Sequence, residues 1–342
     1  MSVIKLSKRP FAVAEITEEL RKARAHCLNL NSHFSVAAAG EYQLSEHEYA
    51  LILGVNVEDA KLNRLSLHAE HSVLTNAQIL LGERAKLNKL YVMGGIETAL
   101  PGMSDGSADL ACQMCGNCRQ LILSSCLPDA VMYSITINGK ISKAYSLKER
   151  LPDAFSEQDV RPVETKPNCP EVLTQSPSFD THSAKYQYTN LLNRFTPLET
   201  DEILNYLCSL TPHIISKAYQ TSKINSCIIK INHRGKPFYA AGTLVQDIAF
   251  LTADALFTAL VCTVTEHGWH ELVFDEIYLL VDKLTAVPLN GAELDLIGRF
   301  NKGNNIPIHV FTQEAVDHQA GAYEKLTLRE CLEHFAAALM AF

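Results

Sequence analysis

The chain has 342 residues, of which 47% are hydrophobic and 20% charged, and its formal net charge is −8. This composition is typical of a globular protein with about two domains, and it excludes a disordered or collagen-like chain. Proteins that grip a phosphate backbone usually present a basic face, so a negative chain without a basic cluster disfavours a nucleic-acid partner.

The N-terminal segment opens the chain without an apolar stretch. Residues 1–20 turn acidic early, which disfavours a secretory signal. No run of about 18 apolar residues follows, so we expect no membrane helix. Ten cysteines are scattered along the chain, and without an export signal a disulfide framework is the weaker interpretation. We therefore expect a cytoplasmic protein.

Helices and strands alternate in the first half of the chain. Apolar residues recur at a helical period of about 3.6 in residues 13–29, and residues 94–111 are rich in Gly, Ser and Asp, which predicts a long loop. The expected order is helix 13–29, strands 33–39 and 49–55, helix 67–83, strand 88–93, the loop, helix 116–125 and strand 130–137. This order predicts an α/β sheet with helices on both faces.

The second half repeats the first in kind and order after a proline-rich polar segment at 156–184, which has the composition of a linker. The expected elements are a helix at 200–219, strands at 225–232 and 237–243, a helix at 251–266 and a strand at 274–281. An ungapped alignment of residues 54–59 with 242–247 matches Gly, Val and Asp. Internal duplication explains the repeat, and chance similarity between two α/β segments is the alternative.

Carried forward without a gap, the same alignment places His68 on Leu256 and Glu70 on Thr258. No Cys-x-x-Cys occurs in the second half of the sequence. We therefore predict a zinc-binding domain at residues 1–155, a linker at 156–184, and a degenerate copy without zinc at 185–342.

A metal site is indicated by His68-Ala69-Glu70 and Cys115-Gly116-Asn117-Cys118, each at the start of an expected helix. Cysteines three residues apart share one side of a helix's first turn, where free N–H groups and the helix dipole favour thiolates. With His68 they make three ligands, which leaves a fourth position for water, as in a catalytic zinc site. Glu70 would then lie beside that water as a proton shuttle.

Two other donors keep a closed structural site open as an alternative. Cys112 precedes Cys115 by three residues, and His71 follows Glu70 directly. Either could complete a four-ligand structural zinc site. Coincidental cysteines in a core are a further alternative.

The motifs HAE and CGNCRQ, with GVNVE upstream, resemble the zinc-dependent cytidine deaminases that act on free nucleosides. RLPDAFSEQDV at 150–160 is similar to the segment that closes the catalytic domain of the two-lobed bacterial members. The resemblance implies a three-layer α/β/α fold with a mixed sheet, duplicated in the chain, and a homodimer. It also implies Zn²⁺ held by His68, Cys115 and Cys118, with Glu70 as the catalytic residue.

Substrate contacts follow from the resemblance alone. It implies that Asn56 and Glu58 bind the ribose hydroxyls, that Phe34 packs on the ring, and that Phe155 covers the pyrimidine in the partner subunit's site. It also implies that the Ala69 N–H binds the ring carbonyl. Each has a simpler alternative: a strand-end turn for Asn56, a solvated charge for Glu58, and core packing for Phe34 and Phe155.

The sequence departs from the family pattern just before the first cysteine. Met114 stands where members have Pro, and Gln113 occupies the place whose carbonyl receives the exocyclic amine. Met is not fixed in the needed geometry as Pro is. The long loop at 94–111 is either a lid or a surface insertion. Arg119 either supports the thiolates or is a helix-surface charge.

The sequence thus predicts hydrolytic deamination of cytidine and 2′-deoxycytidine in pyrimidine salvage. Deamination of another aminated pyrimidine nucleoside is the alternative within enzymes. A zinc-stabilised binding protein without turnover is the alternative outside them, and a nucleic-acid editor is disfavoured by charge.

Overall fold

The computed structural model describes residues 2–30, 32–58, 66–81, 86–152, 197–210, 224–246, 252–282, 284–285, 288–312 and 323–340. We call residues 2–152 the first lobe and residues 197–340 the second lobe. The expected linker at 156–184 and Phe155 lie outside the described residues. Within the described ranges, no helix combines the length and apolar character needed to cross a bilayer.

The first lobe is built on a six-stranded mixed sheet in the order β1-β4-β3-β6-β7-β8, in which only β6 and β7 are parallel neighbours. Its strands are β1 (Ile4–Ser7), β3 (Phe34–Ser45), β4 (Glu48–Val55), β6 (Leu87–Ile96), β7 (Cys126–Ile135) and β8 (Ile141–Ser146). Its helices are α1 (Val13–Arg24), α2 (Ala69–Leu81), α3 (Gly116–Ser125) and α4 (Leu147–Arg150). Short strands β2 (Leu28–Asn29) and β5 (Val57–Glu58) pair beside the sheet, and a 3₁₀ turn, η2, covers Ser107–Asp109.

Helices cover both faces of this sheet, as two adjacent glycines of β6 show. A Cβ on Gly94 would meet Cys112, which precedes α3, whereas a Cβ on Gly95 would come near Arg24 of α1. Successive residues of a strand point to opposite faces, so α1 and the segment before α3 lie on opposite sides. The predicted three-layer α/β/α arrangement with a mixed sheet is confirmed.

The second lobe repeats five of these six strands, all but β1, with the sheet order β10-β9-β13-β14-β15. Again one central pair, β13 and β14, is parallel, and its neighbours are antiparallel. The strands are β9 (Ile224–His233), β10 (Lys236–Thr243), β13 (Leu272–Val281), β14 (Pro307–Thr312) and β15 (Tyr323–Thr327), with short β11 (Val245–Gln246) and β12 (Thr252–Ala253). The helices are α7 (Thr200–Ser209), α8 (Ala255–His267), α9 (Gly291–Phe300) and α11 (Leu328–Met340). The fold is therefore duplicated in the chain, as the sequence predicts.

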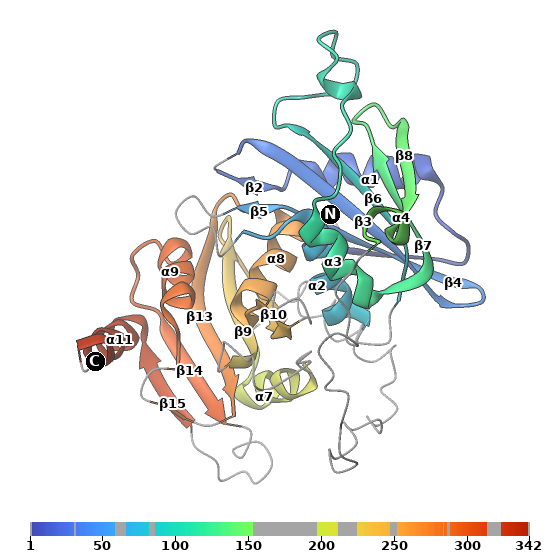
Figure 1. Ribbon diagram of the computed structural model, residues 1–342. Coiled ribbons are helices and arrows are strands. Elements are labelled where there is room, and N and C mark those ends of the chain that lie inside the picture. Colours follow the sequence, from blue (N-terminus) through green and yellow to red (C-terminus); the bar gives the residue numbers. More distant parts are fainter. Residues whose placement is uncertain are drawn as a thin grey trace.

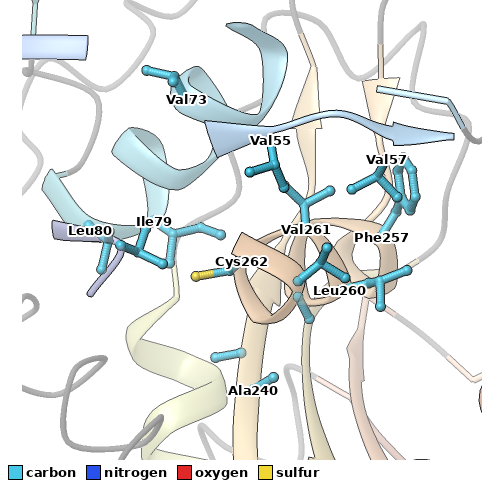
Figure 2. Packing of buried hydrophobic residues seen from close by; sticks show 14 of the residues in the cluster. Val55, Val57, Val73, Ile79, Leu80, Ala240, Phe257, Leu260, Val261 and Cys262 are labelled. Carbon is cyan, nitrogen blue, oxygen red and sulfur yellow. The ribbon is translucent and has the colours of Figure 1, made fainter. Parts of the chain in front are cut away.

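The two lobes pack through α2 and α8 at the centre of the molecule, and α8 also contacts β4 (Figure 1). Figure 2 shows Val55 and Val57 of the first lobe beside Phe257 and Val261 of α8. These residues belong to one continuous buried cluster that runs through both lobes. Burial of this apolar surface joins the lobes, because removing it from water is worth about 25 cal/mol per Å².

Most elements expected from the sequence are present, with shifted ends. The first helix ends at Arg24 instead of residue 29, and the helix expected from residue 200 is described only to Ser209. Near the C-terminal end of the described residues, strand β15 precedes α11. Strand β1, which pairs with β4 at the sheet edge, has no counterpart among the expected elements.

The ungapped alignment of the two halves is wrong beyond β5. Gly54 lies against the backbone of Ala69 and Val73, and Gly242 lies against that of Ala255 and Ala259. These contacts pair Ala69 with Ala255, so His68 corresponds to Asp254 instead of Leu256. The second lobe is two residues shorter between its equivalents of β5 and α2, in segments that fall outside the described residues.

Candidate metal centre and its surroundings

Three side chains meet where the N-termini of α2 and α3 converge. His68 directly precedes α2, Cys115 is the N-cap of α3, and Cys118 lies in its first turn. His68 Nδ1 is 3.4 Å from Cys115 Sγ and 3.3 Å from Cys118 Sγ. All three ligand atoms lie within 4.8 Å of one another. One imidazole and two thiols at this spacing are the donor set of a tetrahedral zinc site with one position left over.

Helix α3 begins in a way that favours a thiolate at Cys115. Its Sγ accepts the N–H of Cys118 at 3.4 Å, as an N-cap oxygen would. A hydrogen bond from the Cys118 thiol, followed by one with His68, lowers the pKa of Cys115 to about 3. The same shared hydrogen bond raises the pKa of Cys118, because Cys115 carries the negative charge. The contact with Cys115 also raises the pKa of His68. A divalent cation among them would favour both thiolates.

Glu70 lies in the first turn of α2 and is 4% exposed. Burial raises the pKa of its carboxyl, although its own backbone N–H and the charge of His68 oppose the rise. Glu70 is also within hydrogen-bonding reach of Cys118. A carboxyl with a raised pKa next to three metal donors is suited to accept and release a proton.

The two spare donors do not join the group. Among the described residues, the only set of His, Cys, Asp and Glu side chains with metal-binding spacing is His68, Cys115 and Cys118. Burial raises the pKa of the Cys112 thiol to about 12, so it resists becoming a thiolate ligand. Burial lowers the pKa of His71 to about 4, and neither of its ring nitrogens has a hydrogen-bond partner. The geometry therefore matches the three-donor site better than the closed one.

Asn56 and Glu58 lie beside this group and are fixed by hydrogen bonds. Asn56 accepts the N–H of Val36 at 2.8 Å and donates to the Phe34 carbonyl at 2.9 Å and to Glu58 at 3.1 Å. The Ser32 hydroxyl donates to Glu58 at 2.9 Å. The Glu58 charge contributes to the raised pKa of His68, so the pair is near the metal donors.

Phe34 is 38% exposed, which excludes the core-packing alternative for this ring. A Cβ on Gly94 would lie 3.1 Å from the Phe34 ring and 3.0 Å from Cys112 Sγ. Phe34 therefore stands on the same face of the sheet as the metal donors. Ala69 opens α2 and is buried, whereas the Gln113 side chain is exposed. The structure thus gathers all of the proposed site residues except Phe155, which it does not describe.

The segment before Cys115 is held in place although it lacks the family's Pro. Met114 is 2% exposed, and its carbonyl accepts hydrogen bonds from Arg119 Nη2 at 2.7 Å and Nε at 3.1 Å. Arg119 Nη1 also donates to the Arg150 carbonyl at 3.1 Å. Arg119 thus holds the backbone just before Cys115 in place. This role differs from both roles expected from the sequence, which were support of the thiolates and a helix-surface charge.

Tyr145 is a neighbour that sequence reasoning did not find. It is buried on β8 and hydrogen-bonds the Met114 backbone, and the charges of Glu70 and Arg119 are near enough to affect its pKa. Burial raises its pKa. The Arg150 guanidinium lies 5.3 Å from the centre of its ring. No motif marks this residue, because only the pairing of β8 with β7 brings it near the site.

Hydrogen bonds tie the loop expected at 94–111 to Asn138, which follows β7, and to Arg24 at the end of α1. Asn138 joins Gly102 and Asp109 by hydrogen bonds of 2.8 Å each, and Arg24 donates to the carbonyls of Ile96 and Ala99. Figure 1 shows the loop projecting beyond the sheet. These contacts favour the surface insertion over the lid.

No family model matches this chain, and no curated protein does either. Among solved structures, the chain is similar to the cytidine deaminase from Burkholderia pseudomallei at 24% identity, with a TM-score of 0.34 over 42% of this chain and 100% of that one. It is similar to the cytidine deaminase from Mycobacterium leprae at 26% identity, with a TM-score of 0.31 over 42% of this chain and 99% of that one. For the cytidine deaminase from Mycobacterium tuberculosis the identity is 22% and the TM-score 0.32, over 43% of this chain and 99% of that one.

Proposed function

We propose that this protein is a zinc-dependent deaminase that converts cytidine and 2′-deoxycytidine to uridine and 2′-deoxyuridine with release of ammonia. One observation carries the proposal: His68, Cys115 and Cys118 form a three-donor group, with the buried carboxyl of Glu70 beside it. A structural metal site has no use for that carboxyl, whereas hydrolysis needs a proton carrier there.

The donor set fits zinc, because one imidazole and two thiolates cancel its charge and leave a coordination position. When bound, zinc would lower the pKa of a water molecule and so supply the nucleophile for attack on C4 of the cytosine ring. The chain's own groups would then do the rest. Glu70 would take the proton from the water and hand it to ring N3, and afterwards assist departure of the amino group as ammonia.

The surrounding residues would place the nucleoside. Asn56 and Glu58 are already oriented by their mutual hydrogen bond, so their remaining lone pairs can accept hydrogen bonds from the ribose hydroxyls without a large ordering cost. The exposed ring of Phe34 would pack on the pyrimidine. The first N–H groups of α2, including that of Ala69, have no acceptor within the helix and would bind the ring carbonyl. The Gln113 carbonyl would receive the exocyclic amine.

A homodimer forms part of the proposal, with Phe155 closing the partner's site. The exposed position of His68 supports the homodimer, because a partner subunit would shield a metal ligand that otherwise lies at the surface. The nine described cysteines are all free, which fits a reducing compartment such as the cytoplasm and a role in pyrimidine salvage. Deamination of a different aminated pyrimidine nucleoside remains the alternative that a substrate panel would reveal.

The decisive experiment follows the loss of ultraviolet absorbance of cytidine, deoxycytidine, cytosine and the deoxycytidine monophosphate with purified protein, and quantifies zinc in the same sample. We expect turnover of the nucleosides and about one zinc per chain. Glu70→Gln should retain zinc and lose activity by at least about 10²-fold, the usual contribution of general acid–base catalysis.

Cys112→Ser is the matched control, because it removes a neighbouring thiol outside the three-donor group. It should keep both zinc and turnover. Loss of zinc in this variant would favour the closed structural site, and full activity of Glu70→Gln would remove Glu70 from the mechanism.

A further inference from the structure

The second lobe has a position equivalent to each metal donor of the first lobe. Helices α3 and α9 both connect the parallel strand pair of their sheet, both span ten residues, and both begin with Gly. Asn290 is the N-cap of α9, as Cys115 is of α3, so Glu293 corresponds to Cys118. With Asp254 in the place of His68, the three equivalents are Asp254, Asn290 and Glu293.

The contacts between these residues support the correspondence independently. His68 touches Cys115 across the two helix starts of the first lobe, and the Asp254 side chain lies within hydrogen-bonding reach of Asn290 across those of the second. The Asn290 Oδ1 accepts the N–H groups of Ala292 at 2.9 Å and Glu293 at 3.0 Å. Its side-chain amide is therefore the donor that reaches Asp254.

Glu293 is the other half of the cap on α9. Its Oε2 accepts the Asn290 N–H at 2.7 Å, and the residue is 2% exposed. Where the first lobe brings two helix starts together around three metal donors, the second lobe has Asp254 beside Asn290, with Glu293 fixing the start of α9. We call Asp254, Asn290 and Glu293 the polar triad.

Two of the other proposed functional positions are leucines in the second lobe. Leu244 follows β10 and donates its N–H to the Asn225 carbonyl, just as Asn56 follows β4 and donates to Val36. Leu256 takes the place of Glu70 and is fully buried. The proton carrier and one ribose-binding side chain are thus replaced by leucines, so a metal held here would have no proton carrier beside it.

We propose that the polar triad is the former metal site of the second lobe, and that its hydrogen bonds now hold the starts of α8 and α9 together without a metal. Two consequences follow. The backbone still has the geometry of a three-donor metal site, so the three donor side chains should restore metal binding. The amide of Asn290 is the link between the helices, so its loss should loosen the start of α8.

The first test is the triple variant Asp254→His, Asn290→Cys and Glu293→Cys. It should bind about one more equivalent of zinc per chain than the unmodified protein. With Co²⁺ in place of zinc, the added equivalent should give the intense charge-transfer absorption of two further thiolate ligands. The correspondence rests on the zinc site proposed for the first lobe. The measured quantity, however, is the difference in metal content between the triple variant and the unmodified protein, so the test stays valid even if the first lobe contains no metal. A folded triple variant with no added metal would overturn the proposal.

The second test keeps the lobe intact should the triple variant not fold. Asn290→Ser retains an oxygen that can cap α9 but removes the amide that reaches Asp254. Amide hydrogen exchange in residues 255–260 should accelerate about threefold or more, as loss of one buried hydrogen bond predicts. Asn290→Ala should accelerate exchange at the start of α9 as well. Unchanged exchange in residues 255–260 with Asn290→Ser would show that Asn290 only caps its own helix and would overturn the linking role.

Discussion

Gly54 is the residue of β4 at which the sheet contacts α2, the helix that begins at the candidate metal centre. A Cβ at this residue would lie 2.5 Å from both the Ala69 carbonyl oxygen and the Val73 nitrogen, which belong to the backbone of α2. Neither atom is at the end of a flexible side chain. Gly54→Ala therefore requires α2 to move away from β4 by roughly 1 Å, and overpacking of this kind costs about 1–3 kcal/mol of stability.

That movement would also displace the groups proposed for catalysis, since His68 and Glu70 stand at the start of the same helix. A misplacement of about 1 Å lowers rates by about 10²-fold, which corresponds to about 2.7 kcal/mol of transition-state stabilisation. We expect Gly54→Ala to lose about two orders of magnitude in kcat/KM. Its zinc should also dissociate faster to a chelator.

Gly242→Ala is the matched control. In the second lobe the added Cβ would meet the Ala255 carbonyl oxygen and, at 2.5 Å, the Ala259 nitrogen, so the steric conflict is the same. Urea unfolding should show a comparable loss of stability for both variants, while deaminase assays and chelator competition should separate them. Equal losses of activity in the two variants would refute the reasoning, because the effect would then be general destabilisation.

Two further predictions concern buried polar groups. Burial, followed by the charges of His233, the N-terminus and His26, lowers the pKa of His267 to about 4 from its ordinary 6.5, so its neutral form stabilises the fold above pH 6.5. That contribution to the free energy of unfolding, up to about 3 kcal/mol, is lost as the pH falls toward 4. In urea titrations, His267→Leu should therefore lose less stability between pH 6.5 and 4 than the wild type, whereas the exposed His47→Leu should behave like the wild type. Equal losses in the wild type and His267→Leu would contradict the role given to His267. Asn56→Ala removes the acceptor of the Val36 N–H and should destabilise the protein by about 1–3 kcal/mol in urea, and a loss below about 0.5 kcal/mol would mean that water replaces the amide.

The sequence by itself determined the donor residues and the repeat. Metal ligands need particular side chains at particular spacings along a helix start, and both Cys115-x-x-Cys118 and His68-x-Glu70 are local patterns that the chain displays directly. The alternation of helices and strands, and its return after the proline-rich segment, are also local, because apolar periodicity depends only on neighbouring residues.

Only the tertiary structure decided how the two halves correspond. The ungapped alignment failed because the second lobe is two residues shorter between its equivalents of β5 and α2, a difference that apolar periodicity does not record. The contacts of Gly54 and Gly242 with their helices corrected it. Asp254, Asn290 and Glu293 carry no motif, so their equivalence to metal ligands emerged from three-dimensional position alone.

The contact of Arg119 with the Arg150 carbonyl, and the approach of Tyr145 of β8 to the Met114 backbone, likewise join segments that lie far apart in the sequence. A sequence pattern records which side chains lie near one another along the chain. It does not record which backbone groups the fold brings to them, and in this protein those groups fix the geometry around the metal donors.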